Sequence, residues 1–183
     1  MKRQQIVNFA LISLLFSYVM SCEKPNNNSD YLVFFSDTVK NEYGYKNQNG
    51  DTIIPLGKYT MCYTDTLRTF AIVLKPDFGF VGIDRQENIL YKVYPFDNGP
   101  DYDSEGLFRI IINDKMGFAD AETGKIVIEP QFGCACPFEN GVAKVSIYCK
   151  SQFDGEHSIW VSDHWFYIDK TGKKVQNSKV VTE

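Results

Sequence analysis

The sequence lacks the concentrations of positive charge that bind nucleic acid. Its 183 residues hold 19 lysines and arginines against 23 aspartates and glutamates, and no basic run follows Arg3. Nucleic-acid binding is therefore not expected, because it depends on neutralising phosphates with Lys and Arg side chains. No segment reaches the roughly 20 consecutive apolar residues that cross a bilayer as a helix. A permanent transmembrane helix is not expected either.

Catalytic and metal-binding signatures are also missing. No Ser/His/Asp order, phosphate-cradling glycine loop or dinucleotide fingerprint stands in a suitable context. The cysteines form no C-x-x-C pairs of the kind that bind zinc. We therefore expect neither an enzyme nor a cofactor. Carboxylate pairs for glycoside hydrolysis stay open, because only their spacing in the fold would identify them.

The N-terminus has the plan of an export signal. A basic start, MKR, precedes an apolar run over residues 6–20, which predicts a helical signal peptide at residues 1–21. The end of this run, VMSC, resembles the lipobox of bacterial lipoproteins. The resemblance implies that Cys22 is lipidated and becomes the first residue of the mature chain. The alternative is a plain secretory signal with a chance cysteine.

The segment after Cys22 is expected to be a flexible tether. Residues 22–30, CEKPNNNSD, are rich in asparagine and lack apolar periodicity. Two or three acyl chains on Cys22, at about 0.8 kcal/mol per methylene, would hold the protein at the membrane. Glu23 is not the aspartate that in related lipoproteins signals inner-membrane retention, so we expect the outer membrane, with a periplasmic or a surface-exposed position both open. Residues 31–183 should fold, because apolar residues make up 44% of the chain and charged residues 23%.

The folded part repeats itself. Gly82 and Gly117 stand 35 residues apart, and residues 105–110, EGLFRI, match residues 140–145, NGVAKV, at the same offset. Two anchors at one offset indicate duplication. A more divergent copy runs from about residue 43 to 74, and a clipped copy, WFYIDKTGKKV, follows an interruption. The sequence thus predicts about three and a half copies.

Each copy predicts a three-stranded meander. In the third, residues 117–120 lead into a Thr-Gly-Lys turn at 123–125, and residues 126–128 return as the paired strand. Pro130 should end that strand, and residues 142–147 alternate as a third strand. A lone unit cannot bury its apolar face, so copies must stack or continue one sheet. We predict an all-β, antiparallel β-meander repeat array with almost no helix.

This pattern resembles the WG repeat family over residues 43–175. Family members carry a Gly-aromatic step, a Thr-Gly-Lys type turn, a proline with an aromatic, and a Glu-Gly or Asn-Gly before a short apolar strand. The corresponding residues are Gly117-Phe118, Thr123-Gly124-Lys125, Pro130 with Phe132, and 137–141. The name-giving tryptophan is replaced by Tyr43 and Met116. The resemblance implies a scaffold or protein-interaction surface and lends no active site.

An insertion at 149–165 interrupts the copies and holds the residues that distinguish this chain. Both histidines, His157 and His164, lie in it, together with Asp163 and Trp160. Insertions in repeat arrays project from one face and carry function more often than strands do. We therefore name these four as candidate binding residues. A hairpin extension with solvated polar ends is the alternative, and a metal or catalytic site would require the histidines to converge.

A short acidic segment is a further candidate site. Asp101, Asp103 and Glu105 alternate as at the start of a calcium-binding EF-hand, but the twelfth position is Ile112. An EF-hand is therefore excluded, and a weaker calcium site or a solvated loop remains.

Four cysteines besides Cys22 could form a disulfide in an exported chain. Cys134 and Cys136 flank Ala135, and a bridge between them would be strained, so we expect Cys149 as a partner. Burial as small apolar side chains is the commonest alternative.

We expect a cell-envelope lipoprotein whose WG-like repeats bind a protein or glycan partner without catalysis. A tryptophan platform at Trp160 and Trp165 could serve such a partner. The alternative is a carbohydrate-active or hydrolytic protein with a site around the 149–165 insertion.

Overall fold

The computed structural model describes residues 30–155 and 157–176, with the side chains of Asp154 and His157 left out. Every regular element in this part of the chain is a β-strand, and no membrane-spanning helix occurs there. The predicted signal peptide, Cys22 and all of the predicted tether except Asp30 lie outside the described residues. The prediction of an all-β antiparallel array is confirmed.

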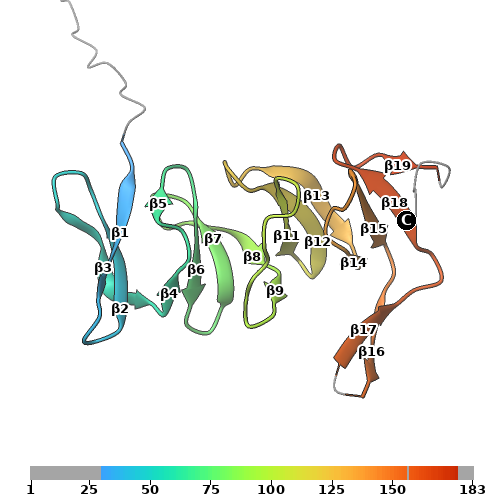
Figure 1. Ribbon diagram of the computed structural model, residues 1–183, viewed down its shortest axis with the longest axis horizontal. Helices are drawn as coiled ribbons and strands as arrows, with labels where there is room; N and C mark the ends of the chain where they lie inside the picture. Colours follow the sequence, from blue (N-terminus) through green and yellow to red (C-terminus); the bar gives the residue numbers. More distant parts are fainter. Residues whose placement is uncertain (1–29, 156, 177–183) are drawn as a thin grey trace, which may run out of the picture.

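Four three-stranded antiparallel meanders stand in a row (Figure 1). We call them repeats 1 to 4. Repeat 1 consists of β1 (Leu32–Asp37), β2 (Glu42–Lys46) and β3 (Thr52–Tyr59); repeat 2 of β6 (Ala71–Lys75), β7 (Gly79–Ile83) and β8 (Ile89–Val93). Repeat 3 consists of β11 (Leu107–Ile112), β12 (Lys115–Asp120) and β13 (Ile126–Phe132); repeat 4 of β15 (Val142–Ser146), β18 (Phe166–Asp169) and β19 (Lys174–Val175).

Each repeat is joined to the next by strand pairing. The chain that leaves the third strand pairs with the first strand of the following repeat, through β4 (Met61–Cys62) on β6, through β8 itself on β11, and through β14 (Cys134–Ala135) on β15. If Phe70, Leu107 and Val142 are counted as first residues, all three junctions pair residues four and five of the receiving strand: Val73 and Leu74, Ile110 and Ile111, Val145 and Ser146. The junctions therefore share one register.

The phase of the repeats differs from the prediction. The strand after Asn140-Gly141 was expected to complete the meander of β12 and β13, but β15 pairs with β14 and β18 instead. The other edge of β12 is filled by β11, through a two-residue turn at Asn113 and Asp114 with φ values of 50° and 58°. Two positive φ angles are typical of the tight hairpin turn that matches strand twist. Each repeat thus begins one strand earlier than predicted.

The turn between the second and third strand indicates four copies among the described residues. An Asn or Asp side chain caps this turn in every repeat by accepting a hydrogen bond from the backbone N–H two or three residues on, and these residues are Asn47, Asp84, Asp120 and Asp169. Such side-chain turns are a common use of Asn and Asp. Repeat 4, predicted as a clipped half copy, is a full meander that the insertion interrupts.

Of the two sequence anchors, one is confirmed and one shifts by a residue. Glu105-Gly106 and Asn140-Gly141 adopt the same turn, with all four φ angles between 52° and 87°. Counted from the capped turns, however, Gly82 occupies the place of Phe118, because each lies two residues before its capping aspartate. A Cβ on Gly82 would lie 2.5 Å from Cε2 of Tyr91, its cross-strand partner. The ring of Tyr91 therefore fills the space that a large side chain takes in other repeats.

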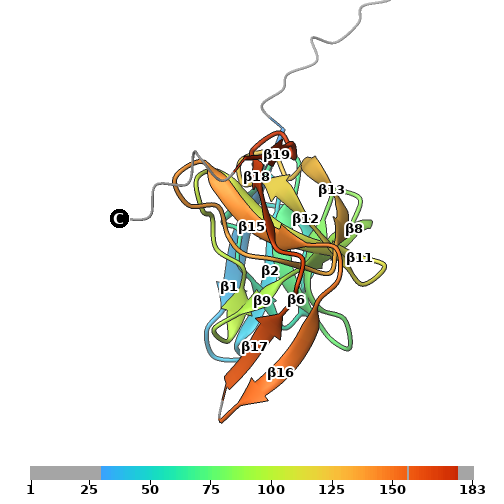
Figure 2. The same cartoon turned by 90° about the vertical axis from the view of Figure 1, so that its right-hand side faces the viewer.

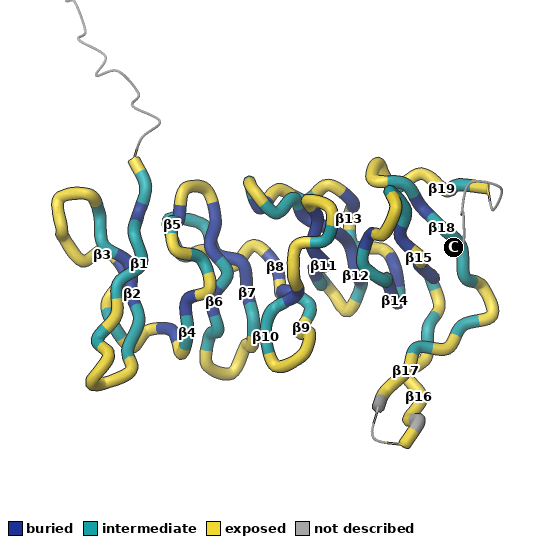
Figure 3. Tube along the Cα trace, in the orientation of Figure 1, coloured by how far each residue is buried: buried dark blue, intermediate teal, exposed yellow. Residues whose placement is uncertain are grey.

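The core consists of apolar layers between neighbouring repeats (Figure 3). In repeats 2, 3 and 4, residues two and four of the first strand face the preceding repeat, as Ala71 and Val73 do in the layer they share with Leu32 and Tyr45. The other two layers follow the same pattern and bury, among others, Phe70, Tyr91, Phe108 and Ile110, or Leu107, Phe118, Ile128 and Val145. Because a fully buried Val, Ile or Phe contributes about 1.5–3 kcal/mol, a single repeat would lose much of its stabilisation.

Within residues 30–176, apart from the undescribed position 156, two hairpins lie outside the repeat pattern. One is formed by β9 (Pro95–Phe96) and β10 (Gly99–Pro100), between repeats 2 and 3. The other is the predicted insertion, formed by β16 (Lys150–Asp154) and β17 (His157–Val161), which projects from the row between β15 and β18 (Figure 1). A short strand, β5 (Thr66–Leu67), pairs with β1.

Candidate functional site

The two extra hairpins meet on one side of the row and bring four aromatic side chains together. Seen along the row from the end of repeat 4, β9 and the insertion hairpin lie toward the same side (Figure 2). The ring centroids of Tyr94 and Trp160 are 5.5 Å apart, and those of Phe96 and Tyr102 are 5.1 Å apart. The guanidinium carbon of Arg109 connects the pairs, 4.3 Å from the centroid of Tyr94 and 5.7 Å from that of Phe96. We call Trp160, Tyr94, Phe96 and Tyr102 the aromatic strip.

A buried ion pair between Arg109 and Asp101 packs against the aromatic strip. Nε of Arg109 donates to Oδ2 of Asp101 at 2.9 Å, Nη2 donates to Oδ1, and the backbone N–H of Arg109 donates to Oδ2 at 2.7 Å. The side chains of Arg109 and Asp101 are 4% and 1% exposed. The charge of Arg109 is thus neutralised by Asp101, and its side chain is buried. Arg109 therefore positions the rings and is not accessible to a ligand. Asp101 is itself fixed by its backbone N–H, which donates to the carbonyl of Tyr94 at 2.7 Å.

The strip is partly open to solvent. Phe96 is 46% exposed and Tyr102 45% exposed, while Tyr94 and Trp160 are half-buried. Burial raises the pKa of Tyr94, and the nearby Arg109 charge offsets only part of that effect. The phenol therefore stays protonated at neutral pH. Rings with one apolar face and a polar edge suit contact with apolar side chains or with the faces of sugar rings.

The insertion hairpin extends this apolar surface. Its register places Ser151 opposite Trp160 and Phe153 opposite Ser158, so Phe153 and Trp160 share one face. Phe153 is 83% exposed. The opposite face of the hairpin carries Ile159 and Val161, both exposed. A two-stranded ribbon is at best marginally stable in water, and this one displays apolar side chains on both faces.

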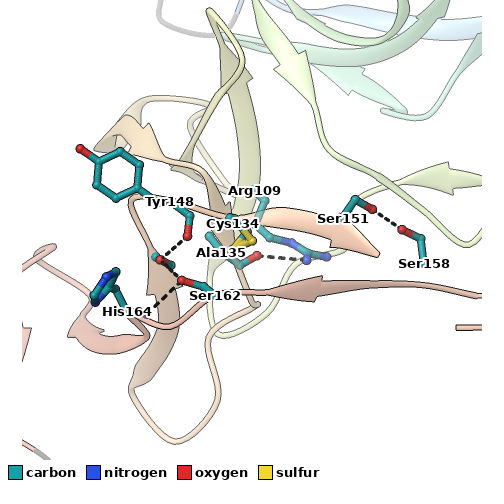
Figure 4. Close-up of a disulfide and its surroundings, with 10 residues drawn as sticks. Arg109, Cys134, Ala135, Tyr148, Ser151, Ser158, Ser162 and His164 are labelled. Atoms are coloured by element: carbon teal, nitrogen blue, oxygen red, sulfur yellow. Dashed lines mark hydrogen bonds between the residues drawn. A yellow bond between two sulfur atoms is a disulfide. The ribbon is translucent and has the colours of Figure 1, made fainter. Parts of the chain in front are cut away.

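The predicted histidine site is only partly described. The side chain of His157 lies outside the described residues; its backbone pairs with Asp154. His164 and Asp163 are exposed and line a shallow depression of about 370 Å³ together with Ile147, Tyr148, Trp165, Phe166 and Lys174. The backbone N–H of His164 donates to Oγ of Ser162 at 3.1 Å (Figure 4).

The two tryptophans have different surroundings. Trp160 contacts Tyr94 in the strip, whereas Trp165 packs against the apolar layer between repeats 3 and 4 with Nζ of Lys144 4.9 Å from its ring. Trp160 is therefore the member of the predicted tryptophan pair that belongs to the aromatic strip.

The three carboxylates proposed as weak calcium ligands have separate partners. Asp101 binds Arg109, as described above. Asp103 accepts the backbone N–H of Gly106 at 2.6 Å. Glu105 forms an ion pair with Nζ of Lys170 at 3.0 Å and accepts the N–H of Gly141, and these contacts, with Lys170 first, lower its pKa. Among the described residues, no three His, Cys, Asp or Glu side chains form a metal-binding group.

A disulfide joins Cys134 of β14 to Cys149, at the base of the insertion hairpin (Figure 4). The prediction that Cys149 pairs with one of the two cysteines around Ala135 is confirmed. Cys136 is half-buried, and burial raises the pKa of its thiol. Cys62 is buried as a small apolar side chain, with its pKa raised to about 11 by burial. The disulfide fixes the hairpin base to the junction between repeats 3 and 4.

Sequence reasoning found Trp160 but missed most of the surface around it. Tyr94, Phe96, Tyr102 and Arg109 were not singled out. The available signal was the segment YPFDNGPDY at 94–102, where three aromatic residues lie among residues typical of turns. Reversing the chain direction does not require aromatic side chains, so their presence in this turn indicates a further role.

Comparison with known proteins identifies the repeat. Residues 116–148, which run from β12 to just beyond β15, match the family model described as the WG containing repeat. No curated protein and no solved structure matches this chain. The chain therefore contains a WG repeat, at residues 116–148.

Proposed function

We propose that this chain is a bacterial cell-envelope lipoprotein whose repeat domain binds a protein partner through the aromatic strip and the adjoining hairpin face. The proposal rests on the two ring pairs, Tyr102 with Phe96 and Tyr94 with Trp160, which the guanidinium of Arg109 connects. Phe153 lies on the same hairpin face as Trp160. Aromatic residues are enriched at the centres of protein interfaces, where they supply most of the binding energy. Contiguous exposed apolar surface on a soluble domain commonly marks such a site.

A protein is favoured over a glycan by the shape of the surface. The apolar surface follows two hairpins and ends on a projecting ribbon, which suits a broad partner better than a single sugar ring. The disulfide at Cys134 and Cys149 and the ion pair at Arg109 hold the surface in one conformation, which reduces the entropy lost on binding. A glycan that stacks on the same rings is the alternative outcome of the test.

The binding test uses the chain from Lys24 onward as bait in envelope extract. Phe96→Ala with Tyr102→Ala, and separately Phe153→Ser, should abolish capture of the partner. The matched control is Phe78→Ala, because Phe78 is 49% exposed but lies in the turn between β6 and β7. A partner lost equally from all variants, or from none, would contradict the proposal. If purified envelope polysaccharide displaces the partner or binds alone with the same variant pattern, the ligand is a glycan.

The lipoprotein part of the proposal rests on the sequence VMSC and is tested separately. Cells that express the chain and are fed a fatty acid with a clickable alkyne should label it, and Cys22→Ala should remove the label. Fractionation should place the labelled chain in the outer membrane, and protease treatment of whole cells distinguishes a surface position from a periplasmic one. An unlabelled chain released as a soluble protein would indicate a plain secretory signal.

We propose no catalytic role. The alternative hydrolytic or carbohydrate-active function would use the insertion, where His164 and Asp163 line the shallow depression. Assays of the purified chain against envelope polysaccharides and peptidoglycan, with His164→Ala as the matched variant, test this alternative. Turnover that disappears in the variant would replace the binding proposal by an enzymatic one.

A further inference from the structure

Repeat 4 carries a second candidate surface, the shallow depression at the base of the insertion hairpin. Its volume of about 370 Å³ is typical of small-molecule sites. Tyr148 and His164 form part of its walls, and their side chains extend to the same side, away from the disulfide (Figure 4). Trp165 and Phe166 also line it, and both are half-buried. Trp160 of the aromatic strip does not line it, so the depression is a separate surface.

Hydrogen bonds and the disulfide hold the two walls in place. The buried Oγ of Ser146 donates to the carbonyl of Tyr148 at 2.8 Å and lies 2.7 Å from Oγ of Ser162. Ser162 in turn accepts the backbone N–H of His164 at 3.1 Å. Cys149, the residue after Tyr148, is fixed by the disulfide. Segments that are held in this way lose little conformational entropy when a ligand binds, so the depression is preorganised.

The lining combines aromatic rings with polar groups of different kinds. Tyr148 is 74% exposed, so its ring is available to a ligand. Asp163 offers a carboxylate that accepts hydrogen bonds, Lys174 an ammonium group that donates them, and His164 an imidazole; all three residues are exposed. A sugar ring matches such a lining, because its C–H face is apolar and its hydroxyls both donate and accept. An apolar protein side chain would cover the aromatic rings but would pair with none of the polar groups.

We infer that this depression binds one sugar residue of a glycan chain. The apolar face of the sugar lies against the aromatic rings, and its hydroxyls bond to the polar lining groups. Because the depression is shallow, the rest of the glycan extends into solvent. Binding occurs without hydrolysis, since Asp163 is the one carboxylate among the described residues that line the depression, and glycoside hydrolysis usually requires two. The site goes beyond the protein-binding function proposed above and does not depend on it.

Tryptophan fluorescence of the purified chain from Lys24 onward tests the inference. The sequence holds two tryptophans, so in a Trp160→Phe background the signal reports Trp165 alone. The probes are the methyl glycosides of a hexose, an N-acetylhexosamine and a hexuronic acid. At least one of them should change the fluorescence in a saturable way, which gives its Kd. No protein partner is present in this titration, so its result is independent of the capture experiment on the aromatic strip.

Variants of the lining should weaken the binding of that probe. Tyr148→Ala removes an aromatic contact and should raise the Kd about two- to tenfold. Asp163→Ala removes a charged acceptor and should raise it about threefold or more. Tyr63→Ala is the matched control and should leave the Kd unchanged, because Tyr63 is 42% exposed but lies in repeat 2, outside the depression. Circular dichroism checks that each variant is folded.

Several results would overturn the inference. One is that none of the three probes changes the fluorescence of Trp165 at its highest soluble concentration. Another is that the folded Tyr148→Ala chain binds the probe as tightly as the natural chain. Binding that is lost in the Phe96→Ala, Tyr102→Ala double variant but kept in Tyr148→Ala would place the sugar on the aromatic strip instead. Release of a free reducing sugar from a methyl glycoside would show hydrolysis and would refute binding without turnover.

Discussion

Replacing Asp101 by asparagine tests the support beneath the aromatic strip. The carboxylate of Asp101 receives three hydrogen bonds from Arg109, and both side chains are almost fully buried. Asparagine keeps the size and shape of the side chain but removes its charge. The Asp101→Asn variant therefore leaves the guanidinium of Arg109 buried without a counter-charge, while the surrounding packing is unchanged.

The expected cost follows from the burial and from what remains around the guanidinium. Breaking a buried ion pair by removing one partner costs about 3–5 kcal/mol. The ring of Tyr94 at 4.3 Å still attracts the cation, a contribution of about 2 kcal/mol at a desolvated site, but that attraction is present before and after the change. We therefore expect about 3 kcal/mol of destabilisation, which for a chain of this size lowers the unfolding temperature by roughly 6–12 °C.

Chemical denaturation followed by circular dichroism measures this change in the free energy of unfolding. A second variant separates charge from packing: Asp101→Leu combined with Arg109→Met removes both charges and should be within about 1 kcal/mol of the natural chain or more stable. The reasoning would be refuted if the Asp101→Asn variant unfolded at the same denaturant concentration as the natural chain. A double variant that is less stable than Asp101→Asn would also refute it. Loss of the whole ion pair would then cost more stability than leaving the charge of Arg109 buried without a partner.

Three further predictions concern the repeat itself. Gly117→Ala should destabilise the chain by about 2 kcal/mol or more, measured by denaturation, because its Cβ would lie 2.7 Å from the backbone N of Pro130. Reducing the Cys134–Cys149 disulfide, which closes a loop of 15 residues, should cost about 3 kcal/mol, seen as a lower unfolding temperature in reductant. Hydrogen bonds from Thr123 and Thr171 lower the pKa of Asp120 and Asp169 below 3.8. The stability that these carboxylates contribute is complete above pH 3.8 and is lost as the pH falls through the lowered pKa values. Replacing Asp120 and Asp169 by asparagine should therefore flatten the acid dependence of stability, measured in denaturation series at several pH values.

The local parts of the fold could be predicted because each is determined by neighbouring residues. The hairpin of β12 and β13 follows from alternation on both sides of Thr123-Gly124-Lys125, and Gly124 has the predicted positive φ of 71°. The turns at Glu105-Gly106 and Asn140-Gly141 agree for the same reason. Alternation and turn chemistry are properties of a few consecutive residues, so they survive divergence between copies.

The phase of the repeats could not be read in the same way. Alternation in β15 fixes which side chains face inward, but it does not say which strand lies beside it. The decisive signal was the Asn113-Asp114 turn, which pairs β11 with β12 and leaves β13 as an outer strand. Asn-Asp is a weaker hairpin signal than Asn-Gly or Asp-Gly, and it was outweighed by the more visible glycine anchors.

The candidate site was the least predictable part because it depends on residues far apart in the sequence. Tyr94 and Trp160 are separated by 66 positions and meet only because repeats 3 and 4 stand side by side. Arg109 occupies the third position of its first strand, where repeat 2 has Ile72 and repeat 1 has Phe34. Repeat 4 has Lys144 at this position, so a charge there does not by itself identify the repeat on which the strip is built; the burial of Arg109 against Asp101 does.

The repeat architecture also explains why individual features gather in two hairpins. In the first strands of repeats 2, 3 and 4, residues two and four belong to the layer with the preceding repeat, and residues four and five also pair with a strand across the junction. Substituting a residue of such a strand therefore disturbs its packing or its pairing with a neighbouring repeat. The connection from Tyr94 to Gly106 and the insertion from Lys150 to Val161 lie outside the strands of the four repeats, although Tyr94 and Trp160 still pack against the layer between repeats 3 and 4. Because these two segments lie beside adjacent repeats on one side of the row, they can form one surface, and binding should change with their residues while the strands of the array stay constant.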